Sequence, residues 1–214
     1  MIASWGIGGL ALRQGDLFRA LPTLERAVGF CRDADLPVFF PWIAWALGAA
    51  YILGGRVADA VPLLTQALEQ MTGTAMGGSQ VLCHLHLSEA HMLAGRLEDA
   101  HALAERAVAL THGQQLRGHQ AYILRLLGEM AARRDPPESA QAEASYQQAM
   151  TLAEELGMRP LQAHCHRGLG ALYAKTGQRE LARAELSTAI EMYQSMEMRF
   201  WLPQAEATLA QVDA

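Results

Sequence analysis

The sequence predicts an all-α protein, a solenoid of five helix hairpins followed by one terminal helix. Three observations lead to this prediction: an alanine pattern that recurs five times, a glycine that ends the first helix of most hairpins, and apolar stripes at helical spacing. The clearest copy of the hairpin runs from Gly168 to Tyr193, where Leu169, Leu172 and Tyr173 share one stripe before Gly177. Stacking such hairpins would bury a continuous core.

The alanine pattern marks the second helix of each hairpin. Ala182 and Ala189 bracket Leu186, and small residues there let two helices approach closely while one larger side chain fills the gap. The other four copies are Ala20/Leu24/Ala27, Ala60/Leu64/Ala67, Ala100/Ala104/Ala107 and Ala142/Tyr146/Ala149. Their first alanines follow one another at intervals of 40, 40, 42 and 40 residues, which indicates an internal repeat.

The predicted turn inside each hairpin is also periodic. Glycine lies five residues before the first alanine in four copies, at Gly15, Gly55, Gly95 and Gly177. In the fourth copy Asp135 takes this place, and Pro136-Pro137 supplies the two extra residues. The helix before each turn carries a recurring pair: Ile7-Gly8, Leu47-Gly48, Leu87-Ser88, Leu127-Gly128 and Leu169-Gly170.

These patterns define repeats at about 1–36, 37–76, 77–115, 116–158 and 159–198, with a terminal helix at 199–214, in one solenoid domain over residues 1–214. The expected helices are 2–14, 16–33, 37–53, 56–71, 79–94, 97–111, 116–133, 137–156, 159–175, 178–195 and 200–212. Polar residues in the last helix suit a terminal helix whose outer face meets water.

The hairpin pattern resembles the tetratricopeptide repeat (TPR). The Leu-Gly pair, the aromatic four residues after the leucine at Tyr51 and Tyr173, and the alanine pattern all match that family. The period exceeds the usual 34 residues by about six, and the family's tryptophan and terminal proline are absent, as in repeats with longer helices and turns. The resemblance implies a right-handed superhelix whose groove, lined by the first helix of each pair, binds proteins or peptides.

A second resemblance covers residues 144–210, on Tyr146-Gln-Gln-Ala-Met and Met198-Arg-Phe-Trp-Leu. This block is similar to the C-terminal part of large bacterial signalling proteins, in which an adenylate/guanylate cyclase or LuxR-like domain precedes a STAND ATPase and TPRs. It implies that the repeats sense a partner or inducer and restrain the ATPase. Because the chain begins inside a repeat, we expect a fragment of such a multidomain protein.

Composition disfavours several functional classes. The formal net charge is −5 and the basic residues are scattered, which argues against a nucleic-acid partner. The longest apolar run, 38–53, contains Pro41 and Gly48 and is shorter than the roughly 20 residues of a membrane span. The three cysteines lie in apolar helical stretches, which suits reduced thiols in the cytoplasm: Cys31, Cys83 and Cys165.

Motifs for cofactors, metals and catalysis are weak. The run from Gly6 to Ala11 matches a dinucleotide fingerprint but lies inside a predicted helix, so we expect no cofactor. The clusters Cys83–His86 and His164–His166 are separated by four helices, on the order of 30 Å, too far to share a zinc ion. We therefore expect packed histidines, no metal and, without a catalytic constellation, no enzyme activity.

The TPR register predicts which side chains line the groove. Counting from the Leu-Gly pairs places eight residues there: Trp42, Trp45, Leu85, Glu89, Tyr122, Arg125, His164 and Arg167. The tryptophans predict an apolar end, and the two arginines predict anchors for a carboxylate. The known Lys/Asn clamp for chaperone peptides cannot form, because the chain has no asparagine. The expected partner is therefore apolar at one end and acidic at the other.

Two alternatives to a peptide-binding scaffold remain open. One is a sensor that captures a small-molecule inducer in the groove, and the other is a structural self-association module. The second alternative is linked to the N-terminal edge, where Trp5, Ile7 and Leu10 present apolar side chains in a repeat with no preceding neighbour. A homodimer through this edge is expected. The sequence does not identify the ligand.

Overall fold

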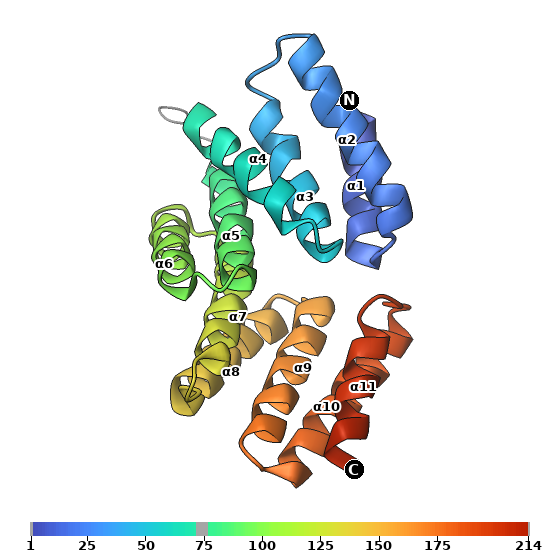
Figure 1. The fold of residues 1–214 in the computed structure, drawn as a ribbon, viewed down its shortest axis with the longest axis vertical. Helices are drawn as coiled ribbons and strands as arrows, with labels where there is room; N and C mark the ends of the chain where they lie inside the picture. The colour runs from blue at the N-terminus through green and yellow to red at the C-terminus, as the bar shows by residue number, and fades with distance from the viewer. Residues whose placement is uncertain (1, 72–76, 214) are drawn as a thin grey trace. The chain divides into compact units, whose positions relative to one another are not determined.

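The protein is α-helical throughout the part of the chain that the structure describes. The computed structural model describes residues 2–71 and 77–213, and these ranges form eleven helices and no strand (Figure 1). The helices group into two compact units, Met1–Leu116 and Arg117–Ala214. The expectation of an all-α helical-repeat solenoid is confirmed, and the boundary between the units falls next to a predicted repeat boundary.

The first unit contains three helix hairpins. Its helices are α1 (Ile2–Gln14), α2 (Leu17–Asp33), α3 (Phe40–Leu53), α4 (Val57–Gln70), α5 (Gly77–Leu93) and α6 (Leu97–Gln114). The second unit contains α7 (Arg117–Arg133), α8 (Ser139–Glu155), α9 (Arg159–Lys175), α10 (Arg179–Ser195) and α11 (Leu202–Asp213). The predicted end of the second repeat, residue 76, lies outside the described residues, as do residues 1 and 214.

The helix ends follow local signals, with two shifts from the expected positions. The helix α3 begins at Phe40 instead of residue 37, because residues 37–39 form a turn and Pro41 occupies the first helical turn. The helix α5 begins at Gly77, two residues before the expected start. The other described helices begin and end within three residues of the predicted bounds.

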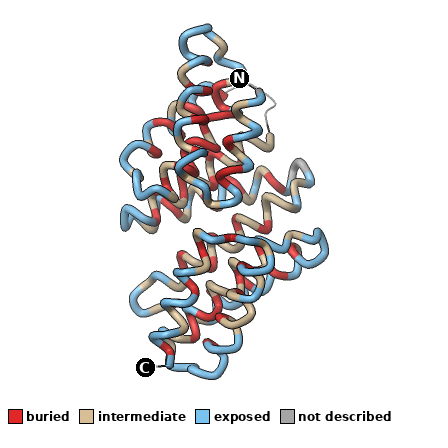
Figure 2. Tube along the Cα trace, turned by 90° about the vertical axis from the view of Figure 1, so that its right-hand side faces the viewer, coloured by how far each residue is buried: buried red, intermediate tan, exposed pale blue. Residues whose placement is uncertain are grey.

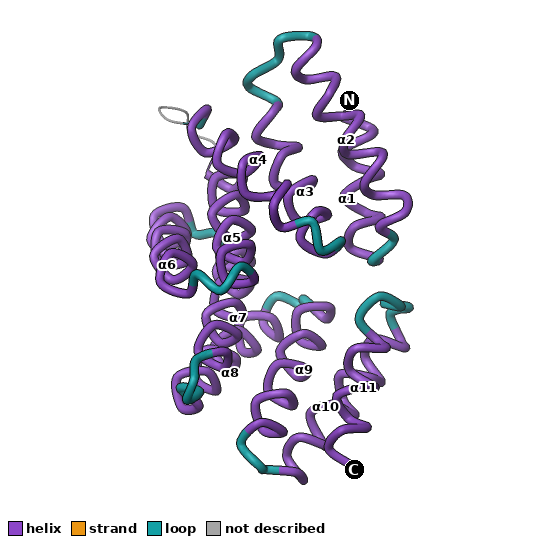
Figure 3. Tube along the Cα trace, viewed as in Figure 1, coloured by secondary structure: helices purple, strands orange, loops and turns teal. Residues whose placement is uncertain are grey.

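Most of the described turns between helices, drawn in teal in Figure 3, contain a residue of positive φ. The four predicted turn glycines have φ between 73° and 78°, a conformation that glycine adopts without a Cβ penalty: Gly15, Gly55, Gly95 and Gly177. The turns that join one hairpin to the next also have a residue of positive φ: Asp35, Gln115, Gly157 and Glu197. Four of the five hairpins are thus closed by the same backbone conformation at the predicted glycine, and the fourth hairpin is the exception.

Four of the five hairpins place a glycine opposite a bulky side chain. A Cβ atom on Gly48 would lie 2.7 Å from Cγ of Leu64, and one on Gly170 would lie 2.6 Å from Cγ of Leu186. Gly128 is similarly close to the ring of Tyr146, at 3.1 Å. The Leu-Gly pair and the alanine pattern therefore describe two sides of one contact, at which the helix backbones approach closely.

The third hairpin uses a different pair at the same contact. Ser88 replaces the glycine, and the facing residue is the small Ala104. The Ser88 hydroxyl is buried and donates a hydrogen bond of 2.6 Å to the carbonyl oxygen of Ala100. The larger residue on one helix is thus matched by a smaller one on the other, and the buried hydroxyl is satisfied.

Buried side chains fill the interior of each unit (Figure 2). In the first unit, residues from α3 and α5, including Ile43, Leu47, Cys83 and Leu87, share one core. In the second unit, Tyr146, Leu169 and Leu186 belong to a core that joins α8, α9 and α10. Within the described residues, no helix is long and apolar enough to cross a membrane.

A candidate ligand-binding trough

The second unit contains a pocket with a volume of about 470 Å³. Its walls come mainly from α7, α9 and α11, and α9 contacts both of the other helices. The lining residues are Arg125, Glu129, Ala132, Arg133, Tyr146, His164, Arg167, Gly168, Ala171, Leu172, Lys175, Gln204 and Thr208. This volume lies within the roughly 300–1,000 Å³ that is usual for ligand pockets.

A second pocket, of about 530 Å³, continues the first along α9. The two share Ala171, Lys175 and Thr208, and the second also reaches Arg179 and Gln211. We call the two pockets together the trough. Small residues of α9 lie along it, so the backbone of a bound segment could approach the helix closely.

Charged residues of α7 form one wall of the trough. The Glu129 carboxylate accepts hydrogen bonds from Arg125 at 2.8 Å and from Arg133 at 2.9 Å. Burial alone would raise the pKa of Glu129, but the charges of Arg125, Arg167 and Arg133 outweigh it and lower the pKa to about 2. Glu129 is therefore ionised at neutral pH and lies among three arginines.

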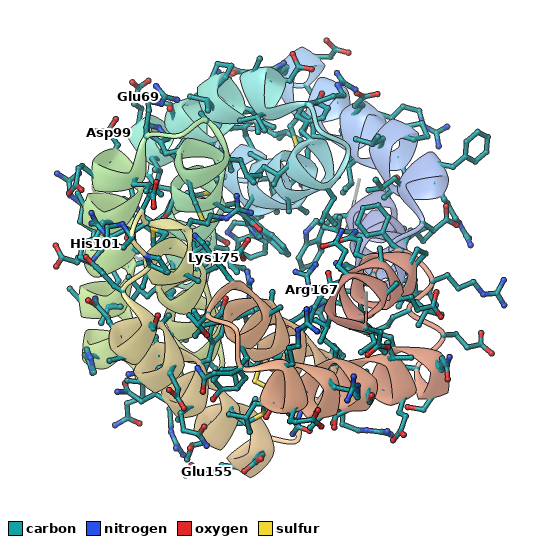
Figure 4. All side chains as sticks on the ribbon, turned by 60° about the horizontal axis from the view of Figure 1, so that its bottom comes forward. Glu69, Asp99, His101, Glu155, Arg167 and Lys175 are labelled. Atoms are coloured by element: carbon teal, nitrogen blue, oxygen red, sulfur yellow. The ribbon has the colours of Figure 1, made fainter. Side chains whose placement is uncertain are left out.

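Arg167 of α9 lies at the centre of the same pocket. Its Nη1 donates a hydrogen bond of 2.7 Å to Oε1 of Gln204 on α11. Its Nε atom is buried and has no hydrogen-bond partner. Figure 4 shows the Arg167 side chain beside the terminal helix. Arg167 thus lines the pocket while its Nε is sealed from it.

Lys175 closes the trough at the C-terminal end of α9. Its Nζ donates hydrogen bonds to the carbonyl oxygens of Ala132, at 3.1 Å, and Arg134, at 3.3 Å. These are the last carbonyls of α7 and the turn after it, where a cation is favourable. Lys175 therefore connects α9 to α7 and adds positive charge to the trough (Figure 4).

His164 reaches the trough from a position inside an aromatic cluster. Its Nδ1 lies 2.7 Å from the hydroxyl of Tyr193, and its ring packs edge-on against Trp201 at 5.2 Å. Burial, followed by the charges of Arg167 and Arg125, lowers the pKa of His164 well below its ordinary value, although Glu129 opposes the shift. The ring is neutral at physiological pH and acts as a packed aromatic residue.

The predicted groove residues of the second unit are placed unequally. Arg125, His164 and Arg167 line one pocket together. Tyr122 is partly buried and packs against the core of the unit. The sequence reasoning did not select the polar wall supplied by α11, which is formed by Gln204, Thr208 and Gln211. Their spacing places them on one helical face, and this spacing was the sequence signal that could have identified them.

The predicted groove residues of the first unit differ in exposure. Trp42 is 43% exposed and packs edge-on against Phe39 at 6.0 Å. Trp45 is partly buried and stacks on His86, also at 6.0 Å. Glu89 lies 3.3 Å from Nδ1 of the same histidine. Trp45 and Glu89 thus both contact His86, whereas Trp42 packs against Phe39.

Leu85, unlike the other predicted groove residues of the first unit, is buried. Its side chain is only 4% exposed, although the TPR register placed it in the groove. The reason is that α5 packs against α3, α4 and α6, so that Val81, Cys83, Leu85 and Leu87 are all buried. A ligand on the surface of this unit would not contact Leu85 directly.

The cysteine and histidine clusters do not form a metal site in the described part of the chain. No group of three or more histidine, cysteine, aspartate or glutamate residues there could hold an ion. Burial raises the thiol pKa of Cys83 and of Cys165 to about 12, so both are protonated. His166 instead lies 2.6 Å from the carboxylate of Glu185.

Comparison with known proteins identifies the fold. No protein-family model and no curated protein sequence matches the chain. Among solved structures, it is similar to a putative kinesin light chain with nearly identical TPR-like repeats from Podosopora anserina, with a TM-score of 0.59 and 20% identity, over 91% of this chain and 95% of the other. This likeness defines the class of protein: a helical solenoid of TPR-like repeats.

Two longer regulatory proteins share the same fold. The Rap conjugation gene regulator of plasmid pLS20, solved in complex with the Phr* peptide, has a TM-score of 0.76 and 19% identity, over 91% of this chain and 53% of the other. Aspartyl phosphate phosphatase F from Bacillus subtilis has a TM-score of 0.69 and 14% identity, over 98% of this chain and 57% of the other. This chain thus spans about half the length of both.

Proposed function

We propose that this chain is a protein- or peptide-binding scaffold, and that its trough receives the partner. One observation carries the proposal: Arg125, His164 and Arg167, from the first helices of two successive hairpins, line a single open pocket whose lining holds four basic side chains and one acidic one. Charge complementarity then favours an acidic segment of the partner. The peptide complex of the similar Rap regulator supports the proposal by analogy.

The proposed partner segment also has an apolar part. Trp42 offers an exposed ring and Trp45 a partly exposed one, and tryptophan is prominent among residues that dominate binding energy. We propose these two side chains as apolar anchors and Arg125 as a polar anchor. In this proposal Glu89 and Tyr122 position neighbouring side chains, and the buried Leu85 stabilises the packing of α5.

Binding of a peptide library to the full chain tests this proposal. The best-bound peptide should lose affinity by roughly tenfold or more for Trp45→Ala and for Arg125→Ala, because each substitution removes a major contact. Arg13→Ala, at an exposed position of α1, serves as the charge-matched control. Unchanged affinity in both variants, with their circular dichroism intact, would remove these surfaces from the binding site.

A small-molecule inducer is the second candidate ligand. It is favoured by the volume of the first pocket, about 470 Å³, which suits a compact metabolite. A metabolite at 100 times its dissociation constant should stabilise the protein by about 2.7 kcal/mol. Thermal-shift screening measures this effect, and stabilisation by peptides alone would favour the scaffold.

The proposed cellular role is a regulatory arm without enzymatic activity. The resemblance of residues 144–210 to cyclase- and LuxR-linked STAND ATPases supports a place within a larger bacterial signalling protein. Three free, buried cysteines suit the reducing cytoplasm: Cys31, Cys83 and Cys165. Sequencing the gene upstream of residue 1 tests the parentage, because a phosphate-binding loop motif is expected there.

We also propose that α1 mediates pairing of two copies. Ile7 is 46% exposed and Leu10 is 60% exposed, whereas the equivalent residues of the second hairpin, Leu47 and Ala50, are buried. In the second hairpin this face is buried by neighbouring helices, whereas in α1 the same face is exposed. A second copy could cover it in the same way.

A further inference from the structure

Tyr146 of α8 reaches from its own hairpin to the next one. Its ring packs on Gly128 of α7, where an added Cβ would lie 3.1 Å from the nearest ring atoms. The far end of the ring meets Gly168 of α9, where an added Cβ would lie 2.5 Å from Cζ and 2.7 Å from the hydroxyl oxygen. An alanine at position 168 would displace the phenol, so the side chain can pass α9 only because this residue is glycine.

The repeat register shows that this combination is particular to one junction between hairpins. The residues that correspond to Tyr146 and Gly168 at the other three junctions are Leu24 with Ala46, Leu64 with His86, and Ala104 with Leu126. A leucine with an alanine therefore suffices for the fold at the first junction. The hydroxyl of Tyr146 is not a requirement of the repeat.

This hydroxyl opens into the first pocket of the trough. Tyr146 is only 3% exposed and belongs to the pocket lining, so its small accessible area lies there. Within the described residues the hydroxyl has no hydrogen-bond partner, and it is not among the unpartnered polar atoms that are sealed from solvent, as Nε of Arg167 is. A buried side chain thus ends in an accessible hydroxyl that remains free to bond.

The charges near this hydroxyl oppose one another. Burial raises the pKa of Tyr146, the charge of Glu129 raises it further, and the charges of Arg125 and Arg167 lower it. The phenol is therefore protonated at neutral pH and can donate a hydrogen bond. An anionic acceptor at this point would meet the Glu129 carboxylate, so an uncharged acceptor suits the hydroxyl better. In peptides the most frequent uncharged acceptor is the amide carbonyl.

We propose that Tyr146 is a recognition residue of the trough, and that its hydroxyl donates a hydrogen bond to an amide carbonyl of the ligand. The proposal rests on the proposed binding of a partner by the trough and names one group that the trough recognises. Two sources share this chemistry, the side chain of glutamine or asparagine and the peptide backbone. With either source, the second helix of a hairpin supplies a ligand contact in addition to the first helices.

The test follows the backbone amide signal of Gly168 by NMR in the full chain, because this residue lies beside the hydroxyl. The probes are the N-acetyl, N-methylamide derivatives of glutamine, glutamate and alanine, all at one ionic strength. The glutamine derivative should shift the signal in a saturable way and bind more tightly than the glutamate derivative, which has the same shape and a negative charge. An alanine derivative that binds as tightly as the glutamine one identifies the backbone as the source, and weaker binding identifies the side chain.

The substitution Tyr146→Phe isolates the hydroxyl, because it keeps the ring between Gly128 and Gly168. It should weaken binding of the glutamine derivative by roughly fivefold or more, as expected for the loss of one hydrogen bond. It should leave the urea midpoint unchanged, since no described protein group bonds to the hydroxyl. Tyr173→Phe is the matched control: its hydroxyl donates to Glu143 at 2.7 Å and lies outside the lining of both pockets, so the affinity should not change.

A double substitution tests whether the phenol depends on the space at Gly168. Gly168→Ala alone should lower both the urea midpoint and the affinity, because the new Cβ meets the ring. Adding Tyr146→Leu reproduces the pair Leu24 and Ala46, and should restore the midpoint but not the affinity. Full recovery of the affinity with leucine would show that the hydroxyl is not the recognition group and would overturn the proposal.

The outcomes distinguish this inference from the proposed function. Equal binding of the glutamine derivative by the wild type and by Tyr146→Phe overturns the role of Tyr146, even if library peptides bind and sustain the scaffold. Tightest binding of the glutamate derivative, or a Gly168 signal that responds to none of the probes, also overturns it. Binding of an amide that depends on Tyr146, with no binding of any library peptide, would keep the recognition residue and reject the peptide-binding function.

Discussion

The contact between glycine and a bulky side chain predicts a thermodynamic coupling that can be measured in the second hairpin. The third hairpin pairs Ser88 with Ala104, whereas the second pairs Gly48 with Leu64. A variant that enlarges Gly48 and shortens Leu64 together should therefore lose less stability than the two single substitutions predict. The test uses the variants Gly48→Ala, Leu64→Ala and the combination of both.

Each single substitution has a distinct cost. A methyl group on Gly48 would lie 2.7 Å from Cγ of Leu64, the branch point of that side chain, so Leu64 must shift. Overpacking of this kind costs about 1–3 kcal/mol, offset by about 1 kcal/mol of improved helix propensity. Leu64 has no exposed surface, and its truncation to alanine should cost about 2–5 kcal/mol.

The double variant should be more stable than the sum of the two single costs predicts. The new methyl group no longer meets Leu64 and fills part of the cavity, while the gain in helix propensity remains. The expected coupling is about 1–3 kcal/mol, measured by urea unfolding followed by circular dichroism. Gly9→Ala is the control, because its Cβ would meet nothing within 4 Å, so this substitution should be neutral or slightly stabilising. Costs that add within about 0.5 kcal/mol would refute the proposed contact.

Three further predictions concern other parts of the chain. Burial raises the pKa of Glu129, but the charges of its arginine neighbours outweigh burial and lower the pKa to about 2. The ionised carboxylate therefore stabilises the fold fully above the ordinary carboxylate pKa, and this stabilisation is lost as the pH falls through about 2. Glu129→Gln should thus cost on the order of 2 kcal/mol near neutral pH and progressively less below about pH 5 in urea titrations; a cost independent of pH would contradict this account. Gly177→Ala should cost about 1–2 kcal/mol, because φ is +78° and the added methyl group meets no neighbour; an unchanged urea midpoint would argue against a required left-handed turn. Leu10→Glu should shift sedimentation toward the monomer and Leu181→Glu, also exposed, should not; a wild-type chain that is already monomeric at high concentration excludes pairing through α1.

Features determined within one hairpin could be predicted from the sequence. The turn glycines, the alanine pattern and the apolar stripes each act over a few residues, and together they located the helices. The start of α3 was predicted three residues too early. Phe39, the residue before α3, makes no side-chain capping hydrogen bond, so the local sequence carried little information about that boundary.

Features that depend on packing between hairpins were predicted less well. The register placed both Leu85 and Arg125 in the groove, because both occupy the same position of their repeats. Leu85 is buried since α3, α4 and α6 all cover α5, whereas Arg125 lies in the lining of the trough. The sequence periodicity is identical in the two cases, and the difference comes from the neighbouring helices. That residues 1–214 form a single solenoid domain stays a prediction.

The terminal helix shows how a structural element can also determine specificity. A helix that ends a solenoid needs an apolar face toward the last hairpin, and α11 provides Ala205 and Val212 for that contact. On an adjacent face of the same helix, Gln204 and Thr208 line the trough. Substitutions at these two polar positions can therefore change ligand recognition while the apolar contact, and with it the last hairpin, stays intact. In such a design, the end of the repeat array can change its ligand specificity without loss of the fold.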